Sequence, residues 1–120
     1  MADVVTDIGD TKAYLLAPDG PKVASEQDAV DIIGQLWGQP VALVAIPVER
    51  FADGVFDLKT TLLGHFTQKF IGYGKRLAVL GDLGEHLAAS ESLRAYVRES
   101  NRGRHIWFAA SIDEVAARLS

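Results

Sequence analysis

The 120-residue chain contains no cysteine. It can therefore form no disulfide and no thiolate metal site, and we expect a reducing compartment, the cytoplasm, as its location. A long apolar segment is missing too, because the longest run, Val41–Val48, is far too short to cross a bilayer. The first residues, Met1–Val5, lack the basic and apolar regions of an export signal. We expect no contact with a membrane.

Positive charge is not in excess either. The chain has 12 lysines and arginines against 16 acidic residues, a net charge of −4. Nucleic-acid binding driven by overall charge is therefore not expected. Walker, dinucleotide-binding and Gly-x-Ser-x-Gly motifs are absent, and His65, His86 and His105 share no metal-ligand spacing. We accordingly name no catalytic residue, no metal and no cofactor, and we leave enzymatic activity open.

Apolar residues make up 48% of the chain, enough to build the core of a single domain over residues 1–120. Two short apolar segments, Val4–Ile8 and Ala13–Ala17, flank Gly9-Asp10 and predict an antiparallel hairpin. Further runs do not alternate between apolar and polar residues, which is typical of parallel strands buried on both faces. These runs are Val41–Val48, Leu77–Leu80 and Ile106–Ala109.

Segments with apolar residues at helical spacing alternate with these runs. They begin at Ser25, near Leu58, at Glu91 and at Ile112. The first stripe extends to Trp37 and the second to Tyr73, so both aromatic residues are expected to face the core. Ser25 and the Ser111–Glu114 capping box suit helix starts, and Gly103 suits a helix end. The order predicts an α/β domain whose mixed sheet has about five strands and about four covering helices.

Several short segments resemble the signatures of a bacterial family catalogued as domain of unknown function 4180. They are Ser25–Asp28, Gln68–Phe70, Tyr73, Leu77–Asp82 and Arg98–Gly103. The resemblance runs from about Tyr14 to Leu119 and implies a fold and a bacterial source, but no established activity.

The element order is also similar to STAS-like domains, the fold of anti-sigma-factor antagonists. There, a loop after a central strand and the start of the next helix carry a phosphorylatable serine or threonine and contact the partner. The corresponding stretch here is Glu49–Gly64. It lacks the family's Asp-Ser-Ser-Gly-like pattern, which Asp57–Thr61 resembles only loosely. The likeness therefore rests on analogy of fold.

The helix predicted from about Leu58 offers a first candidate surface. Thr60, Thr61, Gly64, Gln68 and Gly72 fall opposite its apolar stripe. Glycine costs about 1 kcal/mol in a helix relative to alanine, which suggests that another surface packs closely there. That surface could belong to a partner protein, a second copy, or a loop of this chain. Either threonine could be phosphorylated at the helix start, or simply act as its N-cap.

The carboxyl ends of the predicted parallel strands are a second candidate site, since ligands of open α/β sheets bind there. Glu49, Arg50 and Asp82 follow these strands directly, and Arg98 is a further candidate at the same site. Alternatively, the carboxylates cap helices or pair with Arg50 and Lys59.

A basic helix is the third candidate. Arg94, Arg98 and Arg102 recur every four residues and could contact an anion, a small acidic ligand or an acidic partner. Alternatively, they are the cationic end that helices commonly have.

These observations favour a non-enzymatic, STAS-like regulatory or interaction module. It would act by protein–protein contact or self-association through the long helix and the Glu49–Asp57 loop. The alternative is a small-molecule-binding protein or enzyme with a pocket at the strand ends. A concave apolar pocket there would support the alternative, whereas a flat exposed patch on the helix would support the interaction module.

Overall fold

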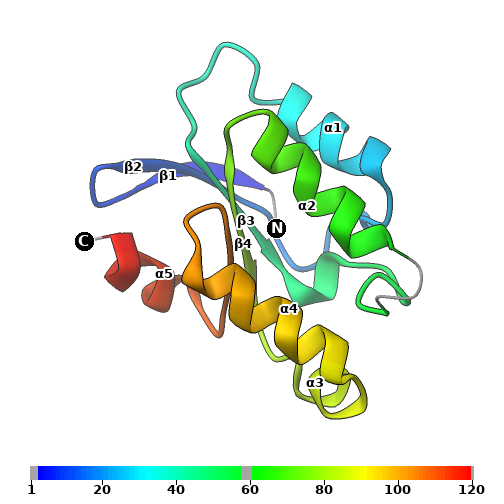
Figure 1. Cartoon of the computed structure of the whole chain (residues 1–120). Coiled ribbons are helices and arrows are strands. Elements are labelled where there is room, and N and C mark those ends of the chain that lie inside the picture. Colours follow the sequence, from blue (N-terminus) through cyan, green and yellow to red (C-terminus); the bar gives the residue numbers. More distant parts are fainter. Residues whose placement is uncertain (1–2, 58–60, 120) are drawn as a thin grey trace.

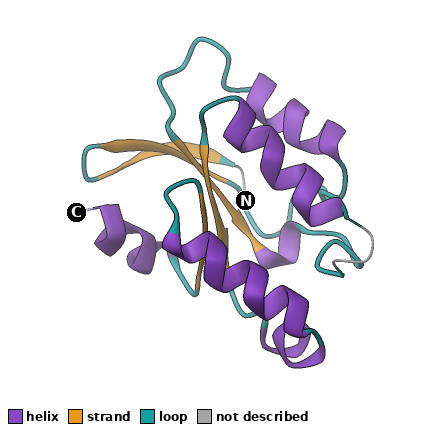
Figure 2. Ribbon diagram, in the orientation of Figure 1, coloured by secondary structure: helices purple, strands orange, loops and turns teal. Residues whose placement is uncertain are grey.

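The computed structural model describes residues 3–57 and 61–119. Within them, five strands form one sheet in the order β1-β2-β3-β4-β5 (Figures 1 and 2). The strands are β1 (Val4–Ile8), β2 (Thr11–Leu15), β3 (Leu43–Pro47), β4 (Arg76–Leu80) and β5 (Ile106–Ala109). Strand β1 pairs antiparallel with β2, and every other pair is parallel. The α/β class and the N-terminal hairpin are thereby confirmed.

Five α-helices accompany the sheet in the described residues, close to the number expected. They are α1 (Glu26–Gly34), α2 (Leu62–Gly72), α3 (Gly84–Ala89), α4 (Glu91–Arg102) and α5 (Ile112–Leu119), with a 3-10 turn, η1, at Val48–Arg50. Ser25 caps α1 through a capping box with Asp28, and Gly103 follows the last residue of α4. Helix α2 begins at Leu62, later than expected, and residues 58–60 lie outside the described residues.

The two faces of the sheet are covered unequally (Figure 1). Alternate residues of a strand point to opposite faces. Val44 and Ile46 of β3 pack in a large core cluster with residues of α1, α2 and α4. Leu43 and Ala45 instead join a smaller cluster with Val115 of α5. The prediction that these strands are buried on both faces is therefore confirmed.

Two aromatic residues expected in the core are exposed. The side chain of Trp37 is 89% exposed and that of Tyr73 is 56% exposed. Helix α1 ends at Gly34, so Trp37 lies beyond the last residue that keeps the helical spacing, and Tyr73 is likewise the residue after α2.

The start of α5 also differs from the prediction. Glu114 accepts a hydrogen bond from the Ala110 N–H at 2.8 Å, one residue before the predicted Ser111.

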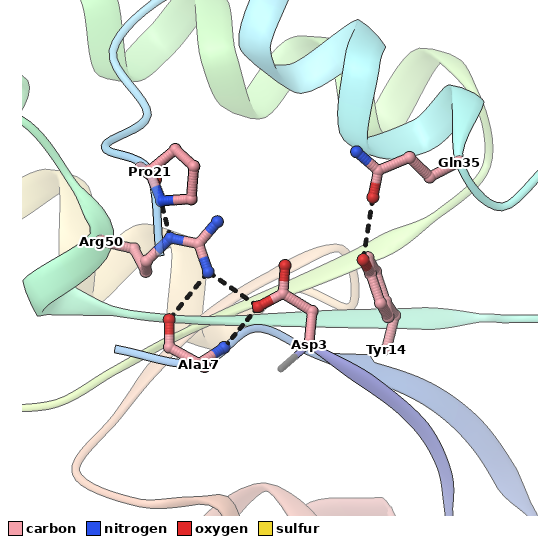
Figure 3. Close-up of polar contacts among 6 residues, drawn as sticks. All are labelled: Asp3, Tyr14, Ala17, Pro21, Gln35 and Arg50. Carbon is pink, nitrogen blue, oxygen red and sulfur yellow. Dashed lines mark hydrogen bonds and ion pairs between the residues drawn. The ribbon is translucent and has the colours of Figure 1, made fainter. Parts of the chain in front are cut away.

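Arg50 is buried at the end of η1, with 4% of its surface exposed. Figure 3 shows its polar contacts. Its Nη1 donates to the Ala17 carbonyl and to Asp3 Oδ1, and its Nε donates to the Pro21 carbonyl, each at 2.8 Å. A Cβ atom on Gly20 would lie 2.5 Å from the guanidinium carbon, so any larger residue there would displace the guanidinium. One side chain thus joins three segments of the chain: the start of β1, the turn after β2, and the end of β3.

The carboxylate of Asp3 is stabilised by the same contacts. Burial raises its pKa, but the Ala17 N–H and the Arg50 guanidinium together outweigh burial, so the pKa lies below its ordinary value of 3.8. A carboxyl group with a lowered pKa stabilises the fold above its unfolded-state pKa. It loses this effect as the pH falls through the folded-state value. Asp3 is therefore expected to stabilise the protein at neutral pH and not in strong acid.

Replacing Asp3 with asparagine should lower the free energy of unfolding at neutral pH by about 1–3 kcal/mol, because buried Arg50 loses its counter-charge. Urea denaturation of both proteins measures this, and the difference should shrink as the pH falls below the ordinary aspartate pKa of 3.8 and the wild-type carboxylate is protonated. Asp7→Asn is the matched control in β1, the strand that Asp3 precedes, because Asp7 pairs with Lys12 but is 67% exposed. Equal losses in the two variants would contradict a special role for Asp3.

Candidate functional site

A hollow of about 400 Å³ opens at the carboxyl ends of β4 and β5. We call it the strand-end pocket. Its apolar lining consists of Val79, Leu83, Leu87, Val97 and Phe108. The remaining lining residues are Gly81, Asp82, Ala109, Ala110 and Glu114. A concave apolar surface therefore lies at the edge where the sequence places a ligand site.

Four elements build this pocket. Val79 of β4 and Phe108 of β5 are register partners, so their side chains lie together on the face of the sheet that α1, α2 and α4 cover. Leu87 comes from α3 and Val97 from α4, and both pack against the same core cluster. Gly81 ends β4 with a φ of +129°, and a Cβ atom there would lie 3.1 Å from Val48 Cγ2. Glycine thus allows the chain to turn closely past η1.

Two carboxylates lie in the wall of the pocket and shape the loops around it. Asp82 Oδ1 accepts a hydrogen bond from the Gly84 N–H at 2.7 Å, just before α3. Glu114 Oε2 accepts from the Ala110 N–H at 2.8 Å, just before α5. Both residues are exposed. The N-cap residue of α3 is Leu83, so the Asp82 bond closes the turn before the helix and does not cap it. Both carboxylates place negative charge beside the pocket.

The strand-end residues named from the sequence have different surroundings. Asp82 lines the pocket. Glu49 is exposed, and its Oε1 would lie 3.5 Å from a Cβ on Gly81. Arg50 does not fit the expectation of ligand contact, because it is buried among Asp3 and backbone carbonyls. Burial of a charge depends on the fold of distant segments, which the position of Arg50 after a strand does not reveal.

A second hollow, of about 560 Å³, lies on the other side of α3. It is lined by Gly54, Phe56, Asp57, His86, Ala89, Ser90 and Ser92. Gly54, Phe56 and Asp57 all belong to the predicted contact loop, Glu49–Asp57. Ser90 accepts a hydrogen bond from the Leu93 N–H at 3.1 Å and so caps α4. Its lining includes Asp57, the last described residue before the gap in the described ranges, and we build no site on it.

Gly64 and Gln68 lie in the wall of a groove between α2 and α4, which we call the interhelix groove. One part, of about 380 Å³, is lined by Thr61, Gly64, His65, Gln68 and Tyr96, and Gln68 and Tyr96 also line an adjoining hollow of about 300 Å³. Thr67 Oγ1 and the Tyr96 hydroxyl, 2.7 Å apart, form a hydrogen bond beside it. The predicted face of α2 is therefore concave rather than flat.

The two candidate threonines are differently placed. Thr60 lies outside the described residues. Thr61 is exposed and occupies the N-cap position of α2 with a φ of +62°, without a side-chain hydrogen bond to the helix. A positive φ is strained for a β-branched residue. Phosphorylation of either threonine stays a prediction.

The arginines of α4 lie along its exposed side. Arg94 Nη1 donates to the Leu87 carbonyl at 2.5 Å, and Arg102 pairs with Glu99 at 3.2 Å. Arg98 is exposed between them. These contacts fit a helix that uses its arginines on its own surface, and anion binding by them stays a prediction.

Several pocket residues were missed by the sequence reasoning. The sequence analysis named none of Val97, Leu87 and Phe108 as site residues, and the Ser111–Glu114 capping box was the only pattern that included Glu114. Over residues 3–57 and 61–119, no group of three histidine or acidic residues could hold a metal ion. No helix within the same ranges is long and apolar enough to span a membrane.

Comparison with known proteins agrees with the resemblance of the sequence. A family described as "Domain of unknown function (DUF4180)" matches residues 8–119. No curated protein and no solved structure matches the chain. The likeness to STAS domains and the bacterial source therefore stay predictions. The match spans nearly the whole chain, and the protein belongs to the family of domains of unknown function 4180.

Proposed function

We propose that this domain binds a small apolar molecule in the strand-end pocket. The observation that carries the proposal is a hollow with an apolar lining at the carboxyl ends of β4 and β5. Small-molecule sites are typically concave and mostly apolar, with a few polar groups that fix the orientation of the ligand. Asp82 and Glu114 supply such polar groups.

Binding without catalysis suits the lining better than an enzymatic role. Covalent catalysis by a hydroxyl, thiol or amine needs a base within hydrogen-bond reach of that nucleophile, and the described lining contains no serine, threonine, cysteine, lysine or histidine. The ionisable residues of the pocket lining are Asp82 and Glu114, and each carboxylate is bonded to a backbone N–H. We therefore favour a binding module, and the absence of cysteine supports the cytoplasm as its place of action.

Filling the pocket should abolish ligand binding. Ala110 lines the pocket and is exposed, so Ala110→Trp should place an indole in the hollow at little cost in stability. In a screen of small aromatic and aliphatic fragments by two-dimensional NMR, wild-type shifts should concentrate at Gly81–Leu83 and Ala109–Ala110, and the variant should lose them. Ala88→Trp is the matched control, because Ala88 is exposed on α3 and does not line the pocket. Fragments that bind elsewhere only, or bind Ala110→Trp equally well, would refute the proposal.

The interhelix groove supports a second candidate function, contact with a partner protein. A Cβ atom on Gly64 would meet no atom within 4 Å, although the residue lies inside a helix, where glycine costs about 1 kcal/mol relative to alanine. Gln68 is exposed beside it. A segment of a partner that packs into the groove would explain why this position has no side chain.

Arginine at position 64 should block such a contact. We expect Gly64→Arg to weaken partner capture from a cell extract, or self-association in sedimentation velocity, at least tenfold through steric overlap. Gly72→Arg is the matched control, since Gly72 is exposed at the end of α2, meets no atom within 4 Å of a Cβ and does not line the groove. If the two variants behave like wild type in both measurements, the groove is not a contact surface.

A further inference from the structure

The charge around the strand-end pocket has one sign. Asp82 and Glu114 line it, and Glu49 lies nearby, with Oε1 3.5 Å from the position of a Cβ on Gly81. No lysine, arginine or histidine is among the described lining residues. From this combination we infer that the pocket binds a molecule with an apolar body and a cationic head, such as a protonated arylalkylamine. The inference rests on the proposed function and adds the ligand class.

The apolar lining and the carboxylates suit the two parts of such a ligand. Val79 and Phe108 form a paired apolar floor, and Leu87 and Val97 add apolar surface from the helices. Burial of the ligand's body against them would be favourable in proportion to the apolar area removed from water. An ammonium group has three donors and no acceptor, so it needs oxygen acceptors nearby.

Asp82 and Glu114 retain acceptor capacity for an ammonium group. Hydrogen bonds from the backbone N–H groups of Gly84 and Ala110 occupy Asp82 Oδ1 and Glu114 Oε2, respectively. An ionised carboxylate accepts at about four lone-pair sites, so one backbone N–H does not exhaust either group. These backbone hydrogen bonds also hold the two carboxylates in fixed positions before a ligand arrives, which reduces the entropy lost on binding.

Basic residues near the pocket have other surroundings. Arg94 contacts one of the lining residues, since its Nη1 donates to the Leu87 carbonyl at 2.5 Å. Arg98 follows Val97 and is exposed. Neither lines the pocket. Two further arginines, Arg76 and Arg118, stack on the Trp107 ring at 4.5 and 4.1 Å, and Arg76 stands at the start of β4, the opposite end from the pocket. The acids at the pocket are therefore not neutralised by a lining cation.

Three probes with the same skeleton test the inference: 3-phenylpropylamine, 3-phenylpropan-1-ol and 3-phenylpropionate. They are cationic, neutral and anionic at neutral pH. Titrations followed through the amide signals of Gly81, Leu83 and Ala109 give the dissociation constants. One exposed ion pair changes an equilibrium constant about two- to fivefold, so the amine should bind about tenfold more tightly than the alcohol, and the acid most weakly. The preference should shrink between about 0.05 and 0.5 M salt because salt screens exposed charges.

Charge-removing variants identify the residues responsible. Asp82→Asn and Glu114→Gln keep an oxygen that can accept the backbone N–H but remove the negative charge. The double variant should bind the amine about tenfold more weakly and the alcohol as well as wild type does. Asp113→Asn is the control for net charge, because Asp113 adjoins Glu114 and is exposed but does not line the pocket. It should leave all three affinities unchanged.

The outcomes separate this inference from the proposed function. Equal binding of amine and alcohol, or undiminished amine binding by the double variant, would overturn the cationic ligand class and leave a pocket for apolar molecules. Tightest binding of the acid would overturn it in favour of the arginines on α4. Failure of all three probes would overturn it as well. The proposed function would fall with it only if the fragment screen also found no occupant of the pocket.

Discussion

The buried guanidinium of Arg50 is the constraint on which the carboxyl edge of this sheet depends. Removing a charge from water is costly unless it is paired and hydrogen-bonded. Here Asp3 supplies the counter-charge, and the carbonyls of Ala17 and Pro21 supply further acceptors. The chain must therefore bring the start of β1 and the turn after β2 against the end of β3. The Val23 and Phe51 segments pair as a parallel bridge beside this cluster and extend the same anchoring. The loop that begins at η1 thus leaves the sheet from a fixed point.

The order of the strands explains where the pocket lies. Strands β2 to β5 follow one another both in sequence and in space, and the connecting helices α1, α2 and α4 pack on one face. A ligand crevice in an open α/β sheet usually forms where the strand order reverses, and this sheet has no such point among its parallel strands. The strand-end pocket arises instead beside α3, a helix of six residues between β4 and α4. No residue of α3 is buried, so this short helix covers the ends of β4 and β5 only in part.

The success of the sequence reasoning depended on how local each feature was. Helix α4 has the bounds Glu91–Arg102 that its spacing predicts, because its N-cap and its glycine stop lie within the segment itself. The prediction that Trp37 faces the core was wrong because spacing alone does not show where a helix ends. The sequence analysis wrongly placed Arg50 at a ligand site, because it could not show that Arg50 is buried. That burial depends on Asp3, 47 residues away, and no local pattern reveals this contact. Phe108 and its pocket neighbours were missed for a related reason: spacing shows that a residue faces the core, not whether the covering helix closes over it.

Basic and acidic side chains lie at opposite ends of β4 and β5, and this distribution bears on which surface binds a ligand. At the amino end of β4 and β5, Arg76 and Arg118 both stack on the Trp107 ring, and Arg76 Nε donates to the Arg104 carbonyl at 2.6 Å. These cations are committed to holding the edge strand β5 in place. At the carboxyl end, Asp82 and Glu114 bond only to backbone N–H groups in the contacts described, so their charges are not balanced there. A chain with a basic helix therefore still presents an acidic field at its pocket. That field favours a cationic ligand over the acidic one that the arginines of α4 suggest when they are considered alone.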